Sequence, residues 1–204
     1  MLLYGRALAG GFSIDVGLGG GFWHLPEGSL AGSLQKAGRY DARQLTQTLS
    51  SGFSIRLSFS YNFYGWASVE AGFSGHGWNL AGDDIGGTGI VGAAAHFHPL
   101  QLWWPERRFD ASVFLGGDWA ILGGGHESDN ANRGLTGGAI ECGLKARYRV
   151  TSWFSAGVDL RFYVPFFKTW IVDWGDEEYS LPDSPSGLFT QLLAVATFHM
   201  QPAE

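Results

Sequence analysis

The sequence predicts an all-β protein, an eight-stranded antiparallel up-and-down β-barrel that crosses a lipid bilayer. The clearest sign is the stretch 53–61, where apolar residues alternate strictly with Ser and Arg, as side chains do on the two faces of a strand. The same alternation around 141–149 and 159–161 puts charged residues on the polar face. A soluble barrel keeps its apolar face inside, whereas a membrane barrel turns it outward, so this pattern predicts lipid outside and ions within.

The composition agrees with one membrane-inserted domain. The chain has 204 residues, which predicts a single domain over 1–204. Apolar residues make up 45%, but no uncharged apolar run reaches the roughly 18 residues of a membrane-spanning helix. The net charge of −6, without a basic run interleaved with aromatic residues, gives no reason to expect nucleic acid as a partner.

In the first half of the chain, four segments alternate between turn residues, at 11–24, 47–63, 65–78 and 87–98. Each has an apolar series that we expect to face lipid. These series are Phe12, Ile14, Val16 and Leu18; Phe53, Ile55, Leu57, Phe59 and Tyr61; Ala67, Val69, Ala71 and Phe73; and Val91, Ala93, Ala95 and Phe97.

The second half repeats the pattern at 108–122, 135–150, 153–168 and 186–200, which completes the even number of strands typical of bacterial barrels. The outward series there are Phe109, Ala111, Val113 and Leu115; Ile140, Cys142, Leu144, Ala146 and Tyr148; Phe154, Val158, Leu160, Phe162 and Val164; and Leu188, Leu192, Ala194, Ala196 and Phe198.

The connections predict the orientation. Those at 63–64 and 151–152 are short, whereas those after the first, third, fifth and seventh strands are longer and rich in Gly, Asp, Asn and Pro. Short turns face the periplasm in such barrels, so both termini should be periplasmic. The connection 99–107 is the exception in length, and its Trp103-Trp104 pair is expected to be an interfacial anchor or, alternatively, a docking point for a partner.

Aromatic residues gather at both predicted edges of the apolar band, as expected for two membrane interfaces. The tryptophans that we assign to these interfaces are Trp23, Trp66, Trp78, Trp103, Trp104, Trp119, Trp153 and Trp170.

From Phe12 to Met200 the pattern resembles the eight-stranded outer-membrane barrels of Gram-negative bacteria, the group that includes the OmpA transmembrane domain and OmpX. The segment from Gln191 to Phe198 looks like the final strand of that group, whose terminal aromatic residue the assembly machinery is thought to read. The resemblance implies a bacterial outer-membrane location and contact with outer-membrane lipid and lipopolysaccharide. The N-terminal residues lack the apolar core of a signal peptide, so we expect a mature chain whose export signal has been removed.

The inward side should carry an ionic network. An unpaired buried charge costs several kcal/mol, so six acids facing five bases should pair with one another and close the narrow lumen. The alternative is a narrow or gated pore. The expected members are Asp15, Arg56, Glu70, Asp110, Asp118, Glu141, Lys145, Arg147, Arg149, Asp159 and Arg161.

No catalytic residue, cofactor or metal site is predicted. His96 and His98 share one side of a strand, but no third ligand is identifiable. Some eight-stranded barrels are lipid A deacylases with a His-x-Ser pair facing the membrane. Here Ser74-Gly75-His76 has the reverse order, and both side chains should point inward. The glycine-rich stretches lack the Lys and helix of a phosphate-binding loop.

The longer loops are the remaining surface for recognition. The segment 170–185 combines aromatic residues with acids and is expected to be a recognition loop for a basic protein partner, or for a divalent cation shared with lipopolysaccharide. Its key residues are Trp174, Asp176, Glu177, Glu178 and Tyr179.

Three functions remain open from the sequence. The first is a non-enzymatic barrel that acts as a structural or interaction component of the envelope, including the role of a subunit in an envelope complex. The second is a narrow channel for small solutes, as in the OmpW-like barrels. The third is a lipid-modifying barrel enzyme.

Overall fold

The computed structural model describes residues 11–24, 32–33, 35–36, 51–79, 85–104, 108–125, 132–172 and 177–200. Antiparallel strands dominate this part of the chain. Its elements are β1 (Gly11–His24), β2 (Gly52–Tyr64), β3 (Ala67–Asn79), β4 (Ile85–Phe97), α3 (Pro99–Trp103), β5 (Phe109–Gly125), β6 (Asn132–Arg149), β7 (Phe154–Val172), β8 (Glu177–Ser180) and β9 (Leu188–Met200).

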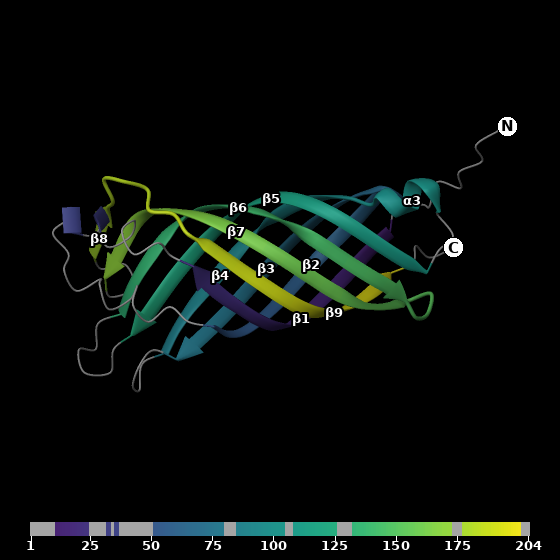
Figure 1. The fold of residues 1–204 in the computed structure, drawn as a ribbon, viewed down its shortest axis with the longest axis horizontal. Helices are drawn as coiled ribbons and strands as arrows, with labels where there is room; N and C mark the ends of the chain where they lie inside the picture. The colour runs from purple at the N-terminus through teal and green to yellow at the C-terminus, as the bar shows by residue number, and fades with distance from the viewer. Residues whose placement is uncertain are drawn as a thin grey trace.

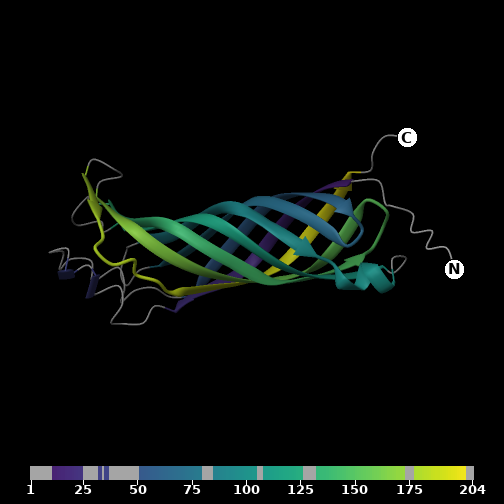
Figure 2. The ribbon, with the colours of Figure 1, turned by 90° about the horizontal axis from the view of Figure 1, so that it is seen from above.

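Eight of the strands close into a barrel (Figure 1). Going around the wall, β1 to β7 follow one another in sequence order, and β9 pairs with both β7 and β1 to complete the ring. All pairings are antiparallel, so the predicted eight-stranded up-and-down barrel is confirmed. Figure 2 shows the strands inclined to the long axis, as barrel closure requires.

The two ends of the barrel differ. The turn end carries α3 and the connections β2–β3 and β6–β7, and β1 begins there beside the end of β9, where Phe12 pairs with Met200. The loop end carries β8 (Figure 1). The periplasmic position of the turn end stays a prediction, as does the treatment of 1–204 as one domain.

The strands depart from their predicted bounds at several points. β7 continues to Val172, beyond the expected end at 168, and residues 177–180 form β8 where a loop was expected. The connection after β4 contains the short helix α3 over 99–103, whereas its residues 105–107 lie outside the described part. The predicted beginning of the second strand, 47–50, also lies outside it.

The polarity is inverted relative to a soluble barrel. Leu57 and Leu144 are 43% and 54% exposed on the outer face, whereas Arg56 and Arg161 are 3% and 0% exposed inside. Because a broad apolar outer surface is unfavourable in water, it indicates a lipid environment. No helix among the described residues combines the length and the apolar character needed to cross a membrane.

Candidate functional site in the barrel interior

A central ionic cluster occupies the interior toward the turn end. It contains as many acids as bases, and its members project from the inner faces of β1, β2, β3, β6 and β7. We call this set the central cluster: Asp15, Glu70, Glu141 and Asp159, with Arg56, Lys145, Arg147 and Arg161.

Glu70 is the acceptor through which β3 is joined to three other strands. It is 1% exposed, and its carboxylate lies 2.8 Å from Nη2 of Arg56, 2.5 Å from Nζ of Lys145 and 2.6 Å from Nη2 of Arg161. Charge-assisted hydrogen bonds are the strongest that side chains form, and here they link β3 to β2, β6 and β7.

Arg161 is the corresponding donor. Its Nε and Nη2 atoms each lie 2.7 Å from Oδ2 of Asp159, and its Nη1 bonds to Glu141. The guanidinium carbon lies 4.5 Å from the centre of the Phe114 ring, within cation–π range. A planar guanidinium suits this role because its five N–H groups can reach several acceptors at once.

Small residues make room for these long side chains. A Cβ atom built on Gly72 would lie 2.7 Å from Cβ of Ser58 and 3.1 Å from Nη2 of Arg56. A Cβ atom built on Gly143 would likewise lie too close to the Phe114 ring, 2.5 Å from its Cζ atom. Alternating small and large inward residues is how a narrow barrel holds a packed interior.

Two residues that the prediction missed extend the central cluster toward the loop end. Arg56 donates from Nη1 to Oη of Tyr163 at 3.2 Å, and Tyr163 in turn donates to Oε1 of Gln191 at 3.3 Å. Ser74 also donates to that oxygen at 2.9 Å. The alternation could have identified Tyr163, because it is two residues from Arg161 on the same strand.

The other predicted network residues lie outside the central cluster. Asp110 accepts hydrogen bonds near the turn end, 2.8 Å from Nδ1 of His98 and 3.5 Å from Nε2 of Gln101. Asp118 is half-buried, and within the described residues neither of its oxygens has a hydrogen-bond partner. Arg149 is exposed, contrary to the prediction, because β6 ends with this residue and the barrel opens there.

The inward histidines take part in polar and aromatic contacts. His96 stacks on Phe114 with ring centres 4.7 Å apart, and its Nε2 lies 3.6 Å from Glu70. His98 lies between Ser68 and Asp110, at 2.9 and 2.8 Å. No group of three or more His, Cys, Asp or Glu residues in the described ranges is arranged to hold a metal ion.

An apolar plug fills the interior toward the loop end. Aromatic contacts hold it together, such as Trp23 stacked on Phe189 with ring centres 4.7 Å apart. The Trp23 indole N–H is satisfied by Oγ1 of Thr88 at 3.1 Å. Its buried members are Trp23, Trp78, Ile90, Ala120, Leu122, Leu135, Ala139, Tyr163, Phe167, Trp170, Leu181 and Phe189.

The plug corrects three of the interfacial assignments. Trp23, Trp78 and Trp170 are only 8%, 3% and 0% exposed, so they fill the lumen and do not lie at a membrane interface. Trp23 lies an even number of positions from Asp15 on β1, and Trp78 lies an even number of positions from Glu70 on β3, so each tryptophan faces inward with its acid. This signal was present in the sequence. The other five predicted tryptophans are exposed: Trp66, Trp103, Trp104, Trp119 and Trp153.

Trp170 points inward because of a β-bulge. Thr136 pairs with Thr169, but the next residue, Gly137, pairs with Phe167, which leaves Lys168 unmatched and exposed. An extra residue on one strand shifts the alternation by one, so both Phe167 and Trp170 face inward.

The predicted recognition loop is partly a strand. β8 pairs with the outer part of β7, where Tyr179 lies opposite Trp170 and packs against the plug, while Glu178 is exposed. Leu181 enters the plug, and its backbone N–H donates to the Lys168 carbonyl at 2.8 Å. The segment folds back because β7 extends past the end of its pairing with β9 and offers backbone partners to this returning chain. Trp174, Asp176 and the Glu177 side chain lie outside the described part.

Ser74 and His76 both lie in the interior, 0% and 4% exposed. Nδ1 of His76 is 2.8 Å from Oγ of Ser54, and its ring lies beside those of Trp78 and Phe189. The barrel wall separates both side chains from the outer, lipid-facing surface.

No protein-family model and no curated protein matches the chain. Solved structures do match its fold. Neisserial surface protein A aligns with a TM-score of 0.62 at 10% identity, over 92% of this chain and 96% of that one. A major outer membrane protein from Thermus thermophilus aligns at 0.58 and 16% identity, over 94% and 100%. The attachment invasion locus protein Ail of Yersinia pestis aligns at 0.53 and 14% identity, over 94% and 99%.

At these identities the likeness establishes the fold, and the resemblance predicted from the sequence is confirmed at that level. Together with the apolar outer face, it supports the predicted bacterial outer-membrane location. The chain has the fold of the small eight-stranded outer-membrane β-barrels.

Proposed function

We propose that this chain is a non-enzymatic outer-membrane barrel with a closed lumen, which acts as a structural or interaction component of the cell envelope. The observation that carries the proposal is the filling of the interior by two successive layers, the central cluster and the plug. A barrel of eight strands has space for little beyond its own side chains.

Each layer opposes the passage of solutes for a different reason. In the central cluster, a passing ion would have to separate buried pairs such as Glu70 and Arg161, and breaking a buried pair costs about 3–5 kcal/mol. In the plug, a hydrated ion would have to cross packed aromatic rings, where it loses its water without gaining polar partners.

The position of Ser74 and His76 supports a non-enzymatic role. An acyl chain of a membrane lipid lies outside the barrel wall, whereas these side chains are buried inside it. A nucleophile must come within about 3.5 Å of its substrate, so this pair is poorly placed for lipid A deacylation.

Interaction with partners would use the two ends of the barrel. At the turn end, Trp103 is the last residue of α3 and is 67% exposed, and Trp104 follows it and is 49% exposed. We propose that these two tryptophans anchor the barrel at the inner interface or receive a partner protein. At the loop end, the acidic segment 170–185 would face lipopolysaccharide or a basic partner. The outer face would contact outer-membrane lipid.

Planar-bilayer recording tests the closed lumen. We expect no steady single-channel current from the wild-type chain. A variant that thins both layers, with Glu70→Ala and Arg161→Ala in the central cluster and Trp78→Ala and Trp170→Ala in the plug, should conduct. Removing one acid and one base keeps the charge of the cluster balanced. Steady conductance of the wild type would overturn the proposal and favour the narrow channel.

The matched control is Trp103→Ala with Trp104→Ala, which removes two exposed tryptophans outside the lumen and should leave the bilayer silent. The same variant tests the interaction role, because it should lose a partner captured by cross-linking in intact cells. Mass spectrometry of lipid A with and without the protein tests the enzyme alternative, and a modified lipid A that depends on the protein would contradict the non-enzymatic proposal.

A further inference from the structure

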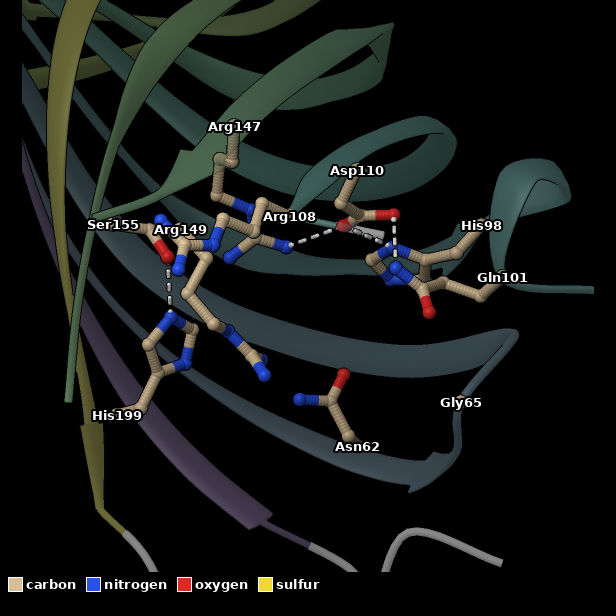
Figure 3. Close-up of a pocket in the computed structure, with 10 residues that line it drawn as sticks. All are labelled: Asn62, Gly65, His98, Gln101, Arg108, Asp110, Arg147, Arg149, Ser155 and His199. Atoms are coloured by element: carbon tan, nitrogen blue, oxygen red, sulfur yellow. Dashed lines mark hydrogen bonds and ion pairs between the residues drawn. The ribbon is translucent and has the colours of Figure 1, made fainter. Parts of the chain in front are cut away.

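The lumen opens at the turn end into a small basic pocket. The cavity has a volume of about 80 Å³, several times the roughly 10–15 Å³ that one water needs. Arg108, Arg147 and Arg149 line it, together with Asn62 and His199 (Figure 3). We call it the turn-end pocket. It lies on the turn-end side of the central cluster and shares Arg147 with it, whereas Arg108 and Arg149 belong to neither layer that closes the lumen.

Two of the arginines are direct neighbours across the sheet. The backbone N–H of Arg149 donates to the carbonyl of Arg108 at 2.7 Å, which fixes the two residues opposite one another. Like charges in this arrangement destabilise a sheet. Within the part of the chain that the structure describes, neither guanidinium has an acidic side chain within ion-pair distance.

The third arginine is only loosely paired. Arg147 lies 3.6 Å from Asp110 and 3.8 Å from Asp15, longer than the 2.7–2.9 Å of a charge-assisted hydrogen bond. Both carboxylates have closer partners. His98 lies 2.8 Å from Asp110, and Lys145 lies 2.8 Å from Asp15.

The charge of the pocket therefore favours an anion. Three arginines lie around one opening, and Asp110 is the acid among the lining residues, which leaves an excess of two positive charges. A phosphate monoester carries about −1.5 to −2 at neutral pH and offers three strong acceptor oxygens. Planar guanidinium groups match this geometry, whereas a single carboxylate would neutralise only part of the excess.

We propose that the turn-end pocket binds a phosphate-class oxyanion through Arg108, Arg147 and Arg149. The anion would bridge the cross-strand pair Arg108 and Arg149 and supply the close acceptor that Arg147 lacks. Free phosphate or a soluble phosphomonoester offers this chemistry in full, and the phosphodiester headgroup of an anionic phospholipid offers it in part, with about one negative charge and two unesterified oxygens.

The direct test is a titration of the full chain, held in zwitterionic micelles, with inorganic phosphate. Binding is measured by isothermal titration calorimetry and by ³¹P NMR. We expect one saturable site. Arg149→Gln and Arg108→Gln should each weaken binding about tenfold or more, since each removes charge-assisted hydrogen bonds. The matched control is Lys168→Gln, which removes one exposed cation outside the pocket and should leave the Kd within about twofold.

The two sources are separated in nanodiscs. If adding phosphatidylglycerol to a phosphatidylcholine bilayer weakens phosphate binding in the wild type but not in Arg149→Gln, a lipid headgroup occupies the site. If phosphatidylglycerol has no effect, the ligand is a free phosphate. Both outcomes retain the site.

Absence of saturable phosphate binding to the wild type would overturn the proposal. Equal binding by the wild type and both arginine variants would overturn it as well. Far-UV circular dichroism and the thermal midpoint of each variant confirm that it is folded before its affinity is compared. Because both substituted side chains are exposed, the variants should fold like the wild type.

Discussion

Glu70→Gln measures what the central cluster contributes to stability, and Asp183→Asn is its matched control. Both substitutions convert an acid to its amide, and each removes an ion pair of the same length, although Glu70 also pairs with Arg56 and Lys145. The carboxylate of Glu70 lies 2.6 Å from Arg161, and that of Asp183 lies 2.6 Å from Lys36. The pairs differ in burial, because the side chains of the first are 0% exposed and those of the second are 53% and 65% exposed.

The expected magnitude follows from the partners that remain. Without the charge of Glu70, Arg161 keeps Asp159 and Lys145 keeps Asp15, but the nearest carboxylate to Arg56 is then Glu141 at 3.7 Å. Both Glu70 oxygens accept from cations, so the amide must turn its N–H₂ toward one of them. Breaking a buried pair costs about 3–5 kcal/mol, which we expect for Glu70→Gln. An exposed pair contributes about 0–1 kcal/mol, which we expect for Asp183→Asn.

The assay is reversible urea unfolding in lipid vesicles, followed by tryptophan fluorescence, with the free energy of unfolding extrapolated to zero denaturant. The slope with denaturant should be unchanged, which shows that both variants expose the same surface on unfolding. A loss below about 1 kcal/mol for Glu70→Gln, or equal losses for the two variants, would contradict this expectation, because neither burial nor the number of partners would then govern the strength of these pairs.

Two further predictions concern the plug and the outer face. Trp170→Ala should lower the free energy of unfolding by about 3–5 kcal/mol because it leaves a cavity in packed rings, whereas Trp119→Ala, half-exposed to lipid, should cost less than half as much. Similar losses would place the two rings in equivalent environments, against the structure. A nitroxide attached to Cys142, an exposed residue of the outer face, should collide more often with oxygen dissolved in lipid than with a water-soluble nickel chelate. A preference for the chelate would contradict an outward position.

Much of the central cluster could be predicted because alternation is a local property of the chain. Glu141 and Lys145 share a face of β6 because their positions differ by an even number, four, and the same holds for Asp159 and Arg161 on β7, whose positions differ by two. Their pairing follows from the cost of burying single charges in a narrow interior. The plug was missed for a different reason. Its tryptophans were assigned by residue type to membrane interfaces, although Trp23 has the inward alternation.

Depth along the barrel is not encoded in alternation. Arg147 and Arg149 have the same parity on β6, yet Arg147 is partly buried and reaches two carboxylates, whereas Arg149 is exposed where the strand ends. Their different surroundings depend on where each strand begins and ends relative to its neighbours. The turn-end pocket follows from this offset, since Arg108 meets Arg149 only through the pairing of β5 with β6.

Alternation along the chain was sufficient to predict the eight strands of the barrel wall, the face of each strand that meets lipid and the charged character of the lumen, because a period of two is set within a few residues. The inward direction of Trp170, the return of residues 177–180 as β8 and the partners of Glu70 depend on how the strands pair in three dimensions. A bulge and a register belong to two strands at once, so they arise only when segments distant in the chain pair.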